Sequence, residues 1–91
     1  MVNLAMTKQA LKAAKKLDAK QFRQVVTAVL NLLDDPEPHD SQLLKGASRG
    51  ERRIDVGEYR VIYAVGDELV EVLVIGQRND DDVYKIWERM K

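Results

Sequence analysis

The sequence contains no cysteine, and this absence excludes several kinds of chemistry. Without cysteine the chain can form no disulfide, no thiolate metal site and no catalytic thiol, so a reducing compartment is expected. Long hydrophobic runs are also missing: Leu69–Ile75 is the longest, and Glu71 interrupts it. This run is far too short to span a bilayer, and the N-terminus lacks the pattern of a secretion signal. We therefore predict a soluble cytoplasmic protein with no membrane partner.

Net charge is absent as well, although charge is unevenly distributed. The 91 residues predict one domain, covering residues 1–91, and hold 15 basic and 15 acidic side chains. This balance argues against a surface that binds nucleic acid all over. Residues 1–33 nevertheless hold six basic residues and one acidic residue, a local charge of +5, whereas residues 34–41 carry −4. Any site for a polyanion must therefore be local.

The N-terminal region predicts a short strand and an amphipathic helix. Residues 1–6 alternate weakly between apolar and polar, and Thr7 is a suitable N-cap for the helix that follows. Apolar residues then recur at helical spacing, at Ala10, Ala13, Ala14 and Leu17. Lysines on the other side of this helix complete the amphipathic pattern.

A second helix follows directly. Asp18 and Gln21 resemble a capping box, and the apolar residues after them keep helical spacing. Pro36 disfavours helical geometry in the residue before it, so the helix should end near residues 34–35. Residues 36–50, rich in proline, glycine and polar side chains, predict an irregular connection.

The pattern then changes from helical to strand periodicity. Arg52–Val56 alternates between polar and apolar residues, Tyr59–Val65 is rich in β-branched and aromatic residues, and Leu69–Ile75 is nearly all apolar. These stretches predict three strands. Gly57-Glu58 and Gly66-Asp67 lie between these strands and, taken as two-residue turns with glycine first, match type II′ hairpin turns. The three strands should therefore form an antiparallel meander.

The final segment predicts a C-terminal helix. Its apolar residues follow helical spacing behind the acidic run Asp80–Asp82, and carboxylates suit a helix N-terminus. These apolar residues are Val83, Ile86, Trp87 and Met90. The predicted fold class is therefore α+β, with two N-terminal helices packed on a small antiparallel sheet. That sheet combines the short first strand with the three-strand meander, and a C-terminal helix follows it.

The two turns fix a predicted register, and the register decides which side chains share a face. Asp55 should face Arg60, while Tyr63 faces Val70, Val61 faces Val72 and Arg60 faces Leu73. One face is then an apolar core face, formed by Ile54, Val56, Tyr59, Val61, Tyr63, Val70, Val72 and Val74. The other face is predicted to be charged and half open, formed by Arg53, Asp55, Arg60, Ile62, Glu71, Leu73 and Ile75.

Arginines gather on the second face. Arg53 and Arg60 lie on neighbouring strands, and Arg78 leaves the last strand near the Gly57 turn. Planar guanidinium groups that converge on a sheet suit a phosphodiester, because they bind its oxygens and stabilise charge in a transition state. The alternative is a set of ordinary solvated arginines with an Asp55–Arg60 cross-strand pair. Periodicity alone leaves both interpretations open.

Three stretches of the chain carry a resemblance to a known family. They are Leu44–Gly46, Arg52–Tyr63 and Val74–Tyr84, and they include the elements Gly-Glu-Tyr-Arg-Val-Ile-Tyr and Arg-Asn-Asp-Asp-Asp-Val-Tyr. In combination these resemble the core signature of the RelE/ParE superfamily of bacterial toxins, RelE branch. The resemblance implies a toxin that cuts messenger RNA in the ribosomal A site without a metal or a cofactor. It also implies a cognate antitoxin, usually encoded beside the toxin.

The resemblance also implies catalytic roles. The reaction is attack of a ribose 2′-hydroxyl on the adjacent phosphate, which needs a base, charge stabilisation and an acid for the 5′-oxygen. Arg60 matches the arginine that stabilises the phosphate, and Arg78 matches the basic residue near the leaving oxygen. Tyr84 matches the tyrosine that orients the nucleotide or assists proton transfer. Arg53 matches the first of two basic strand positions.

Other residues of the same motifs complete the expected site. Lys45, Arg52 and Gln77 are expected to bind substrate. The second basic strand position of the family is occupied here by Asp55, which is a departure. We expect Asp55 either to lower activity, by pairing with Arg60, or to act as the general base.

Two other functions remain open at this stage. One is a ParE-like protein that poisons DNA gyrase without nuclease activity, and the other is a decayed toxin that retains antitoxin binding. The expected partners are the antitoxin, the ribosome and messenger RNA, with an autorepressing complex on operator DNA formed through the antitoxin. The antitoxin is expected to cover or distort the arginine-bearing face, where Ile62, Leu73 and Ile75 are predicted to be exposed.

Overall fold

The computed structural model describes residues 2–79 and 81–90. Met1, in the predicted first strand, and Asp80, in the predicted acidic run, lie outside the described residues. The elements in chain order are β1 (Asn3–Met6), α1 (Lys8–Lys15), α2 (Ala19–Asp34), β2 (Gln42–Leu43), β3 (Arg52–Val56), β4 (Tyr59–Gly66), β5 (Leu69–Gln77) and α3 (Asp82–Met90). Within these residues, no helix combines the length and the apolar character that crossing a bilayer requires.

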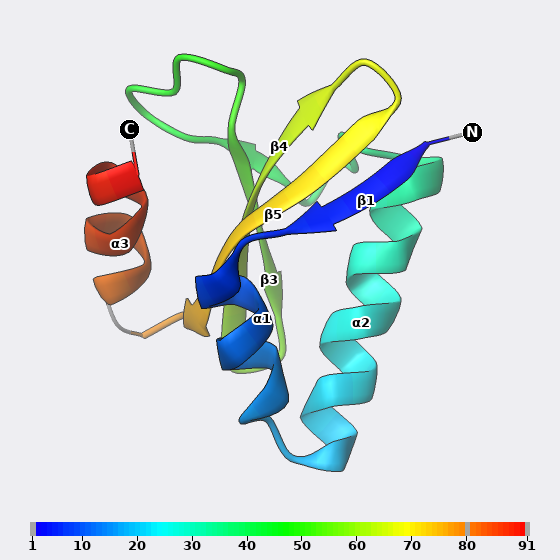
Figure 1. Cartoon of the computed structure of the whole chain (residues 1–91), viewed down its shortest axis with the longest axis vertical. Helices are drawn as coiled ribbons and strands as arrows, with labels where there is room; N and C mark the ends of the chain where they lie inside the picture. The colour runs from blue at the N-terminus through cyan, green and yellow to red at the C-terminus, as the bar shows by residue number, and fades with distance from the viewer. Residues whose placement is uncertain (1, 80, 91) are drawn as a thin grey trace.

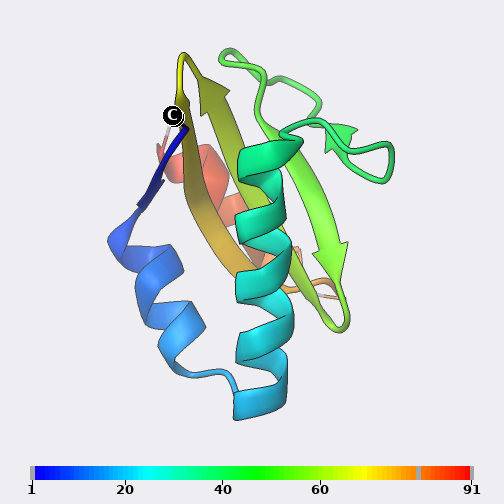
Figure 2. The same ribbon diagram turned by 90° about the vertical axis from the view of Figure 1, so that its right-hand side faces the viewer.

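The molecule has three layers. A five-stranded sheet of order β1-β5-β4-β3-β2 lies in the middle, with α1 and α2 on one face and α3 on the other (Figure 2). Figure 1 shows α3 and α2 on opposite sides of the sheet. The predicted α+β class is confirmed, with two differences: β1 runs parallel to β5, and β2 lies inside the predicted irregular connection. Two residues are too short a segment to show strand periodicity.

Both N-terminal helices begin as the sequence predicts. The Thr7 side chain accepts a hydrogen bond from the backbone N–H of Ala10, and the Asp18 carboxylate accepts one from Gln21 at 2.8 Å. These bonds satisfy N–H groups that have no partner within the helix. Helix α2 ends at Asp34, two residues before Pro36, as the proline requires.

The first hairpin is confirmed in full. Val56 faces Tyr59, and Asp55 faces Arg60. Gly57 has a φ of +57°, a conformation that glycine adopts without the steric cost paid by other residues. This turn therefore fixes Asp55 and Arg60 as direct cross-strand neighbours.

The predicted register of the second hairpin is wrong. The turn residues are Asp67 and Glu68, since Gly66 pairs with Leu69. Glu68 takes the positive φ, at 55°, and Gly66 continues the strand. The prediction, which put Gly66 at the first turn position, therefore placed the turn one residue too early. As a result, Tyr63 faces Val72 instead of Val70.

A β-bulge then changes the faces of β5. The pairing shifts between Ile62 and Tyr63 of β4, which leaves Leu73 of β5 unpaired between Val72 and Val74. The carbonyl of Leu73 accepts a 2.6 Å hydrogen bond from the Thr7 hydroxyl. Leu73 and Val74 are consequently both buried on the face of the sheet that α3 covers, and Ile75 is buried on the face that α1 and α2 cover. The faces predicted for Val74 and Ile75 are therefore exchanged. Arg60 faces Gly76 instead of Leu73.

Two hydrophobic cores result, one on each face of the sheet. The core beneath α1 and α2 includes Ala10, Ala14, Val25, Val29, Leu32, Ile54, Val61, Tyr63, Val70, Val72 and Ile75. The core beneath α3 consists of Leu44, Ile62, Ala64, Leu73, Val74, Val83 and Trp87. The prediction of a half-open second face is therefore wrong, because α3 covers its apolar residues. Its charged residues lie beside the covered part and form the candidate site.

Candidate functional site

The centre of the site is an ion pair between neighbouring strands. Asp55 on β3 accepts two hydrogen bonds from the guanidinium of Arg60 on β4, from Nε at 2.7 Å and from the second terminal nitrogen at 3.1 Å. Hydrogen bonding to Arg60 lowers the pKa of Asp55, and the same bond raises the pKa of Arg60. Because the Arg60 side chain is 15% exposed, the pair is held in a defined geometry at the surface.

Tyr84 reaches this pair from helix α3, which packs against the sheet beside it. Its hydroxyl oxygen accepts a 2.8 Å hydrogen bond from the remaining terminal nitrogen of Arg60. The guanidinium carbon lies 5.5 Å from the centre of the Tyr84 ring, within range of a cation–π interaction. Gly76, which faces Arg60 across the strands, lets α3 come close: a Cβ at this position would lie 2.6 Å from a methyl group of Val83.

Arg53 extends the cluster along β3. One terminal nitrogen of Arg53 lies 3.6 Å from the Asp55 carboxylate, and another donates a 2.6 Å hydrogen bond to the side-chain oxygen of Gln42. Gln42 belongs to β2, which pairs with Arg53 at this position. The short edge strand therefore orients the first arginine of the site.

Arg78 lies where the chain leaves β5. Its backbone N–H donates to the carbonyl of Glu58 in the first hairpin turn, at 3.0 Å, and its side chain is exposed. The positive charge of Arg78 is close enough to contribute to the lowered pKa of Asp55, after the larger effect of the Arg60 hydrogen bond. Three arginines thus surround one carboxylate.

This arrangement is suited to an anion. The hydrogen bonds of Arg60 to Asp55 and Tyr84 engage three of the five N–H groups that a guanidinium carries. The cluster keeps an excess of positive charge over the single Asp55 carboxylate, and a tyrosine hydroxyl lies beside it. Among the described residues, no group of three or more histidine, cysteine, aspartate and glutamate side chains is placed to hold a metal ion.

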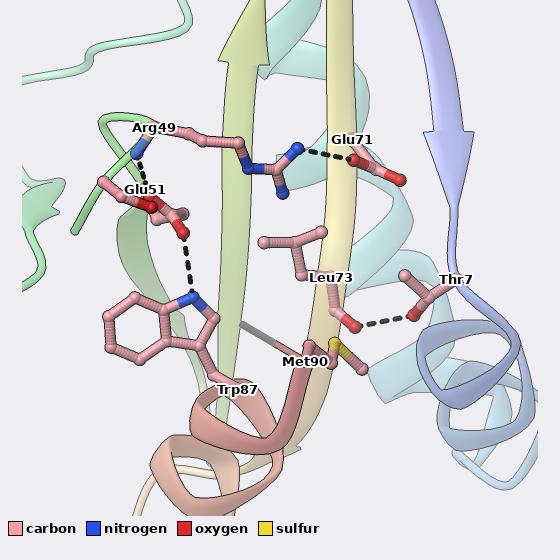
Figure 3. A pocket seen from close by; sticks show the side chains of 8 residues that line it. Thr7, Arg49, Glu51, Glu71, Leu73, Trp87 and Met90 are labelled. Carbon is pink, nitrogen blue, oxygen red and sulfur yellow. Dashed lines mark hydrogen bonds and ion pairs between the residues drawn. The ribbon is translucent and has the colours of Figure 1, made fainter.

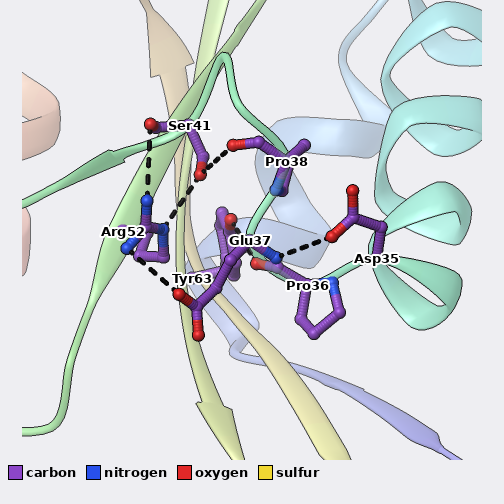
Figure 4. Close-up of polar contacts among 7 residues, drawn as sticks. All are labelled: Asp35, Pro36, Glu37, Pro38, Ser41, Arg52 and Tyr63. Carbon is purple, nitrogen blue, oxygen red and sulfur yellow. Dashed lines mark hydrogen bonds and ion pairs between the residues drawn. The ribbon is translucent and has the colours of Figure 1, made fainter.

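Arg52 lies on the opposite face of the sheet. Its Nε donates to the hydroxyl of Ser41 at 2.9 Å, and its guanidinium lies 3.7 Å from the carboxylate of Glu37 (Figure 4). The hydroxyl of the fully buried Tyr63 donates to the carbonyl of Pro36 at 2.7 Å in the same region. Arg52 and Tyr63 thus anchor the connection between α2 and β2.

Besides Arg52, the residues predicted to bind substrate are Lys45 and Gln77, and both are exposed. Lys45 is in the loop between β2 and β3, and Gln77 ends β5 opposite Tyr59. The structure therefore brings together Arg53, Asp55, Arg60 and Tyr84 directly, with Arg78 nearby.

Sequence reasoning missed two residues that support the site. Gln42 lies in a segment without periodicity, so its contact with Arg53 has no sequence signal. Glu51 is 2% exposed, although a glutamate between arginine residues looks like a surface residue in the sequence. Its carboxylate accepts hydrogen bonds from the backbone of Arg49 and from the indole of Trp87.

Comparison with known proteins identifies the family of this chain. The family model described as "ParE toxin of type II toxin-antitoxin system, parDE" matches residues 4–82. No curated protein matches the sequence.

Several solved structures with a similar fold contain RelE toxins. The chain is similar to archaeal RelE in the RelE–RelB complex from Pyrococcus horikoshii, with 28% identity, a TM-score of 0.75 and coverage of 85% of this chain and 94% of that chain. It is similar to the intact E. coli RelBE toxin–antitoxin complex, with 25% identity, a TM-score of 0.74 and coverage of 85% and 96%. It is also similar to a mutant of E. coli RelE in the free state, with 25% identity, a TM-score of 0.79 and coverage of 99% and 98%. The protein therefore belongs to the RelE/ParE superfamily of toxins from type II toxin–antitoxin systems.

Proposed function

We propose that this toxin is a ribosome-dependent endoribonuclease that cleaves messenger RNA and is inhibited by a cognate antitoxin. The observation that carries the proposal is the contact between Arg60 and Tyr84, which joins a strand and the C-terminal helix at a cluster of arginines. A positively charged donor beside a tyrosine hydroxyl is what a phosphodiester needs for charge stabilisation and for orientation. The similarity to RelE structures supports the same assignment.

The proposed reaction is a transesterification within the RNA. The ribose 2′-oxygen forms a bond to the adjacent phosphorus, and the bond from phosphorus to the 5′-oxygen breaks. The 2′-hydroxyl proton passes to a base, and an acid supplies a proton to the 5′-oxygen, leaving a 2′,3′-cyclic phosphate and a 5′-hydroxyl. Arg60 binds the non-bridging oxygens, Arg78 acts near the leaving oxygen, and Tyr84 orients the nucleotide or assists proton transfer.

Arg53 and Asp55 define how strong this activity is. Arg53 adds positive charge beside the phosphate position, with Gln42 fixing its guanidinium. The Asp55 carboxylate occupies donors of Arg60 that a phosphate could use, so Asp55 reduces activity in our proposal. The other role for Asp55 is that of the general base, and the two roles predict opposite effects of neutralising its charge.

The antitoxin is proposed to bind on the side of α1 and α2. RelE is bound to RelB in similar structures, which supports an antitoxin partner. The exposed large apolar residues of this side are Leu4, Leu11, Phe22 and Leu30. Because residues 1–33 carry a charge of +5, an acidic amphipathic segment is complementary to this surface. The predicted exposure of Ile62, Leu73 and Ile75 is wrong, because all three residues are buried.

A cellular experiment tests the proposed activity. The toxin is expressed from an inducible promoter, and the 5′ ends of messenger RNA are sequenced before and after induction. Endonuclease action on translating ribosomes should produce new ends in phase with codons, and coexpression of the neighbouring antitoxin gene should suppress them. Growth arrest without new messenger RNA ends would contradict the proposal.

Inhibition of DNA gyrase is a second candidate function, favoured by one observation. The family model that matches this chain is the model of ParE toxins. A gyrase poison would cause double-strand DNA breaks after induction and would leave messenger RNA intact. It would also not depend on Arg60 as a phosphate ligand, so the Arg60→Ala variant separates the two functions. A decayed toxin would produce neither effect and would still bind the antitoxin.

A further inference from the structure

Helix α3 provides Tyr84 to the site, so whatever fixes α3 also fixes Tyr84. On the side that faces the sheet, α3 buries Val83 and Trp87, while its last residue, Met90, is exposed. A cavity of about 520 Å³ lies beside the C-terminal half of the helix, lined in part by Leu73, Trp87 and Met90. Apolar packing is therefore incomplete at this end of α3.

A buried carboxylate lies at the edge of this cavity. Glu51, which directly precedes β3, accepts a 2.7 Å hydrogen bond from the backbone N–H of Arg49 and a 3.2 Å hydrogen bond from the indole N–H of Trp87 (Figure 3). Burial works to raise the pKa of Glu51, but the backbone N–H groups and the indole together hold the pKa below its ordinary value. Glu51 is therefore ionised in the folded protein at neutral pH.

Burial of the ionised Glu51 carboxylate is less favourable than burial of an apolar side chain would be. Burying a charge requires compensating hydrogen bonds, whereas an apolar side chain of similar volume packs at no such cost. A hydrogen bond, unlike an apolar contact, depends on direction. The bond from the Trp87 indole N–H to Glu51 therefore restricts the rotation of α3 about its own axis. Trp87 is one helical turn beyond Tyr84, at the i+3 position, so rotation of α3 moves both side chains together.

We propose that Glu51 is a positioning residue, whose hydrogen bond to Trp87 sets α3 in the rotation that places the Tyr84 hydroxyl on Arg60. The chain of contacts runs from Glu51 to Trp87, along one turn of α3 to Tyr84, and from Tyr84 to Arg60 at 2.8 Å. The catalytic consequence rests on the proposed endoribonuclease function, whereas the placement of Tyr84 does not.

The test compares Glu51→Gln with a matched control, Glu71→Gln. Glu71 lines the same cavity and lies 3.7 Å from the Arg49 guanidinium, but its side chain is 32% exposed and belongs to β5. Trp87 is the single tryptophan of the chain, so its emission reports directly on α3. In Glu51→Gln we expect red-shifted emission, increased quenching by acrylamide and faster hydrogen exchange in α3. In Glu71→Gln we expect none of these changes.

Two further measurements distinguish positioning from general support of the fold. The NMR signal of the Tyr84 ring carbon that bears the hydroxyl, assigned with Tyr84→Phe, should shift in Glu51→Gln and in Trp87→Phe. The second variant keeps an aromatic ring but lacks the N–H. Cleavage on ribosomes should fall by about tenfold or more in Glu51→Gln, as expected for a displaced reacting group. With Tyr84→Phe already present, the same change should reduce cleavage by less than about twofold, because the effect passes through the Tyr84 hydroxyl.

The outcomes separate this inference from the proposed function. An unchanged Tyr84 signal in both Glu51→Gln and Trp87→Phe would overturn the inference, because Trp87→Phe removes the indole donor. Equal losses of cleavage with and without the Tyr84 hydroxyl would also overturn it, because Glu51 would then act on the fold as a whole. If the wild-type protein cleaves no RNA, the proposed function fails, while the Tyr84 signal still decides whether Glu51 sets its position.

Discussion

Asp55 and Arg60 face each other across β3 and β4, and the carboxylate accepts two hydrogen bonds from the guanidinium. The pair holds Arg60 in a fixed orientation beside Tyr84. In the proposed function, it also adds a negative charge where the phosphate of an RNA binds, and it engages two N–H groups of the arginine that would stabilise that phosphate. In the proposed function, the balance between these effects sets the rate of RNA cleavage.

Neutralising Asp55 should increase activity. In Asp55→Asn the side chain keeps its shape and loses its charge, so repulsion of the phosphate disappears. A repulsion of about 1 kcal/mol between surface charges corresponds to a roughly fivefold increase in cleavage of messenger RNA on programmed ribosomes. Loss of the cross-strand pair should cost about 0.2–1 kcal/mol of folding free energy, measured by urea unfolding.

A decrease of activity in Asp55→Asn would point to a catalytic role of Asp55. A loss of about 100-fold or more in Asp55→Asn would identify Asp55 as the general base. Asp55→Lys, which restores a basic residue at this position, should raise cleavage further if the charge alone is responsible.

Removing either of two arginines should reduce cleavage strongly. In the proposed mechanism Arg60 and Arg78 each stabilise charge in the transition state, so Arg60→Ala and Arg78→Ala should each reduce the cleavage rate by about 100-fold or more. Arg89→Ala is the control, because Arg89 is exposed in the last turn of α3. Full activity of Arg60→Ala would exclude a role of Arg60 in binding the phosphate.

Tyr84→Phe separates stacking from proton transfer. The variant keeps the ring above Arg60 and removes the hydroxyl that accepts the 2.8 Å hydrogen bond. If the hydroxyl orients the phosphate or transfers a proton, cleavage should fall by about 100-fold, within the range of general acid–base catalysis. Cleavage close to that of the wild type would assign Tyr84 to nucleotide stacking.

The stability of the fold should decrease in acid. The pKa of Asp55 is lowered chiefly by its hydrogen bond to Arg60. A lowered pKa in the folded state stabilises the protein above the unfolded pKa, near 3.9 for aspartate, and this contribution disappears as the pH falls through the folded pKa. The free energy of unfolding should therefore drop below about pH 4. In urea unfolding at pH 6 and pH 3, Asp55→Asn should lose less stability than the wild type. Equal losses in the two proteins would show that the ion pair does not contribute.

Antitoxin binding should depend on the side of the sheet that carries α1 and α2. Leu30 on α2 is 50% exposed and lines a small apolar cavity with Leu4 of β1. Leu30→Asp places a charge in this surface and should weaken binding of the antitoxin by tenfold or more, roughly what a buried hot-spot residue contributes. Leu43→Asp, on β2 at the opposite edge of the sheet, should leave the affinity unchanged. Similar affinities for both variants in a titration would place the antitoxin elsewhere.

Local signals in the sequence were sufficient for much of the fold. Thr7 and Asp18 act as N-caps, Pro36 follows the end of α2, and Gly57 fixes the first hairpin. Each of these features depends on residues within a few positions of one another. The cross-strand neighbours Asp55 and Arg60 follow from the same local geometry, which is why the centre of the site could be predicted.

Features that depend on distant contacts could not be predicted. The bulge at Leu73 is supported by the hydroxyl of Thr7, 66 residues earlier in the chain. Without that contact, simple alternation assigns residues 74 and 75 to the wrong faces. Gln42 and Glu51 likewise acquire their roles from partners on other elements, and no periodicity in the sequence distinguishes them from ordinary surface residues.

The most direct test of the proposed function uses purified toxin, ribosomes programmed with a defined messenger RNA, and analysis of the RNA ends. The wild-type protein should produce a 2′,3′-cyclic phosphate on the upstream fragment and a 5′-hydroxyl on the downstream fragment, at a site in the ribosomal A-site codon. Arg60→Ala should produce these ends about 100-fold more slowly. Intact messenger RNA with the wild-type protein, or equal rates for the two proteins, would contradict our assignment of this toxin as an endoribonuclease that uses Arg60.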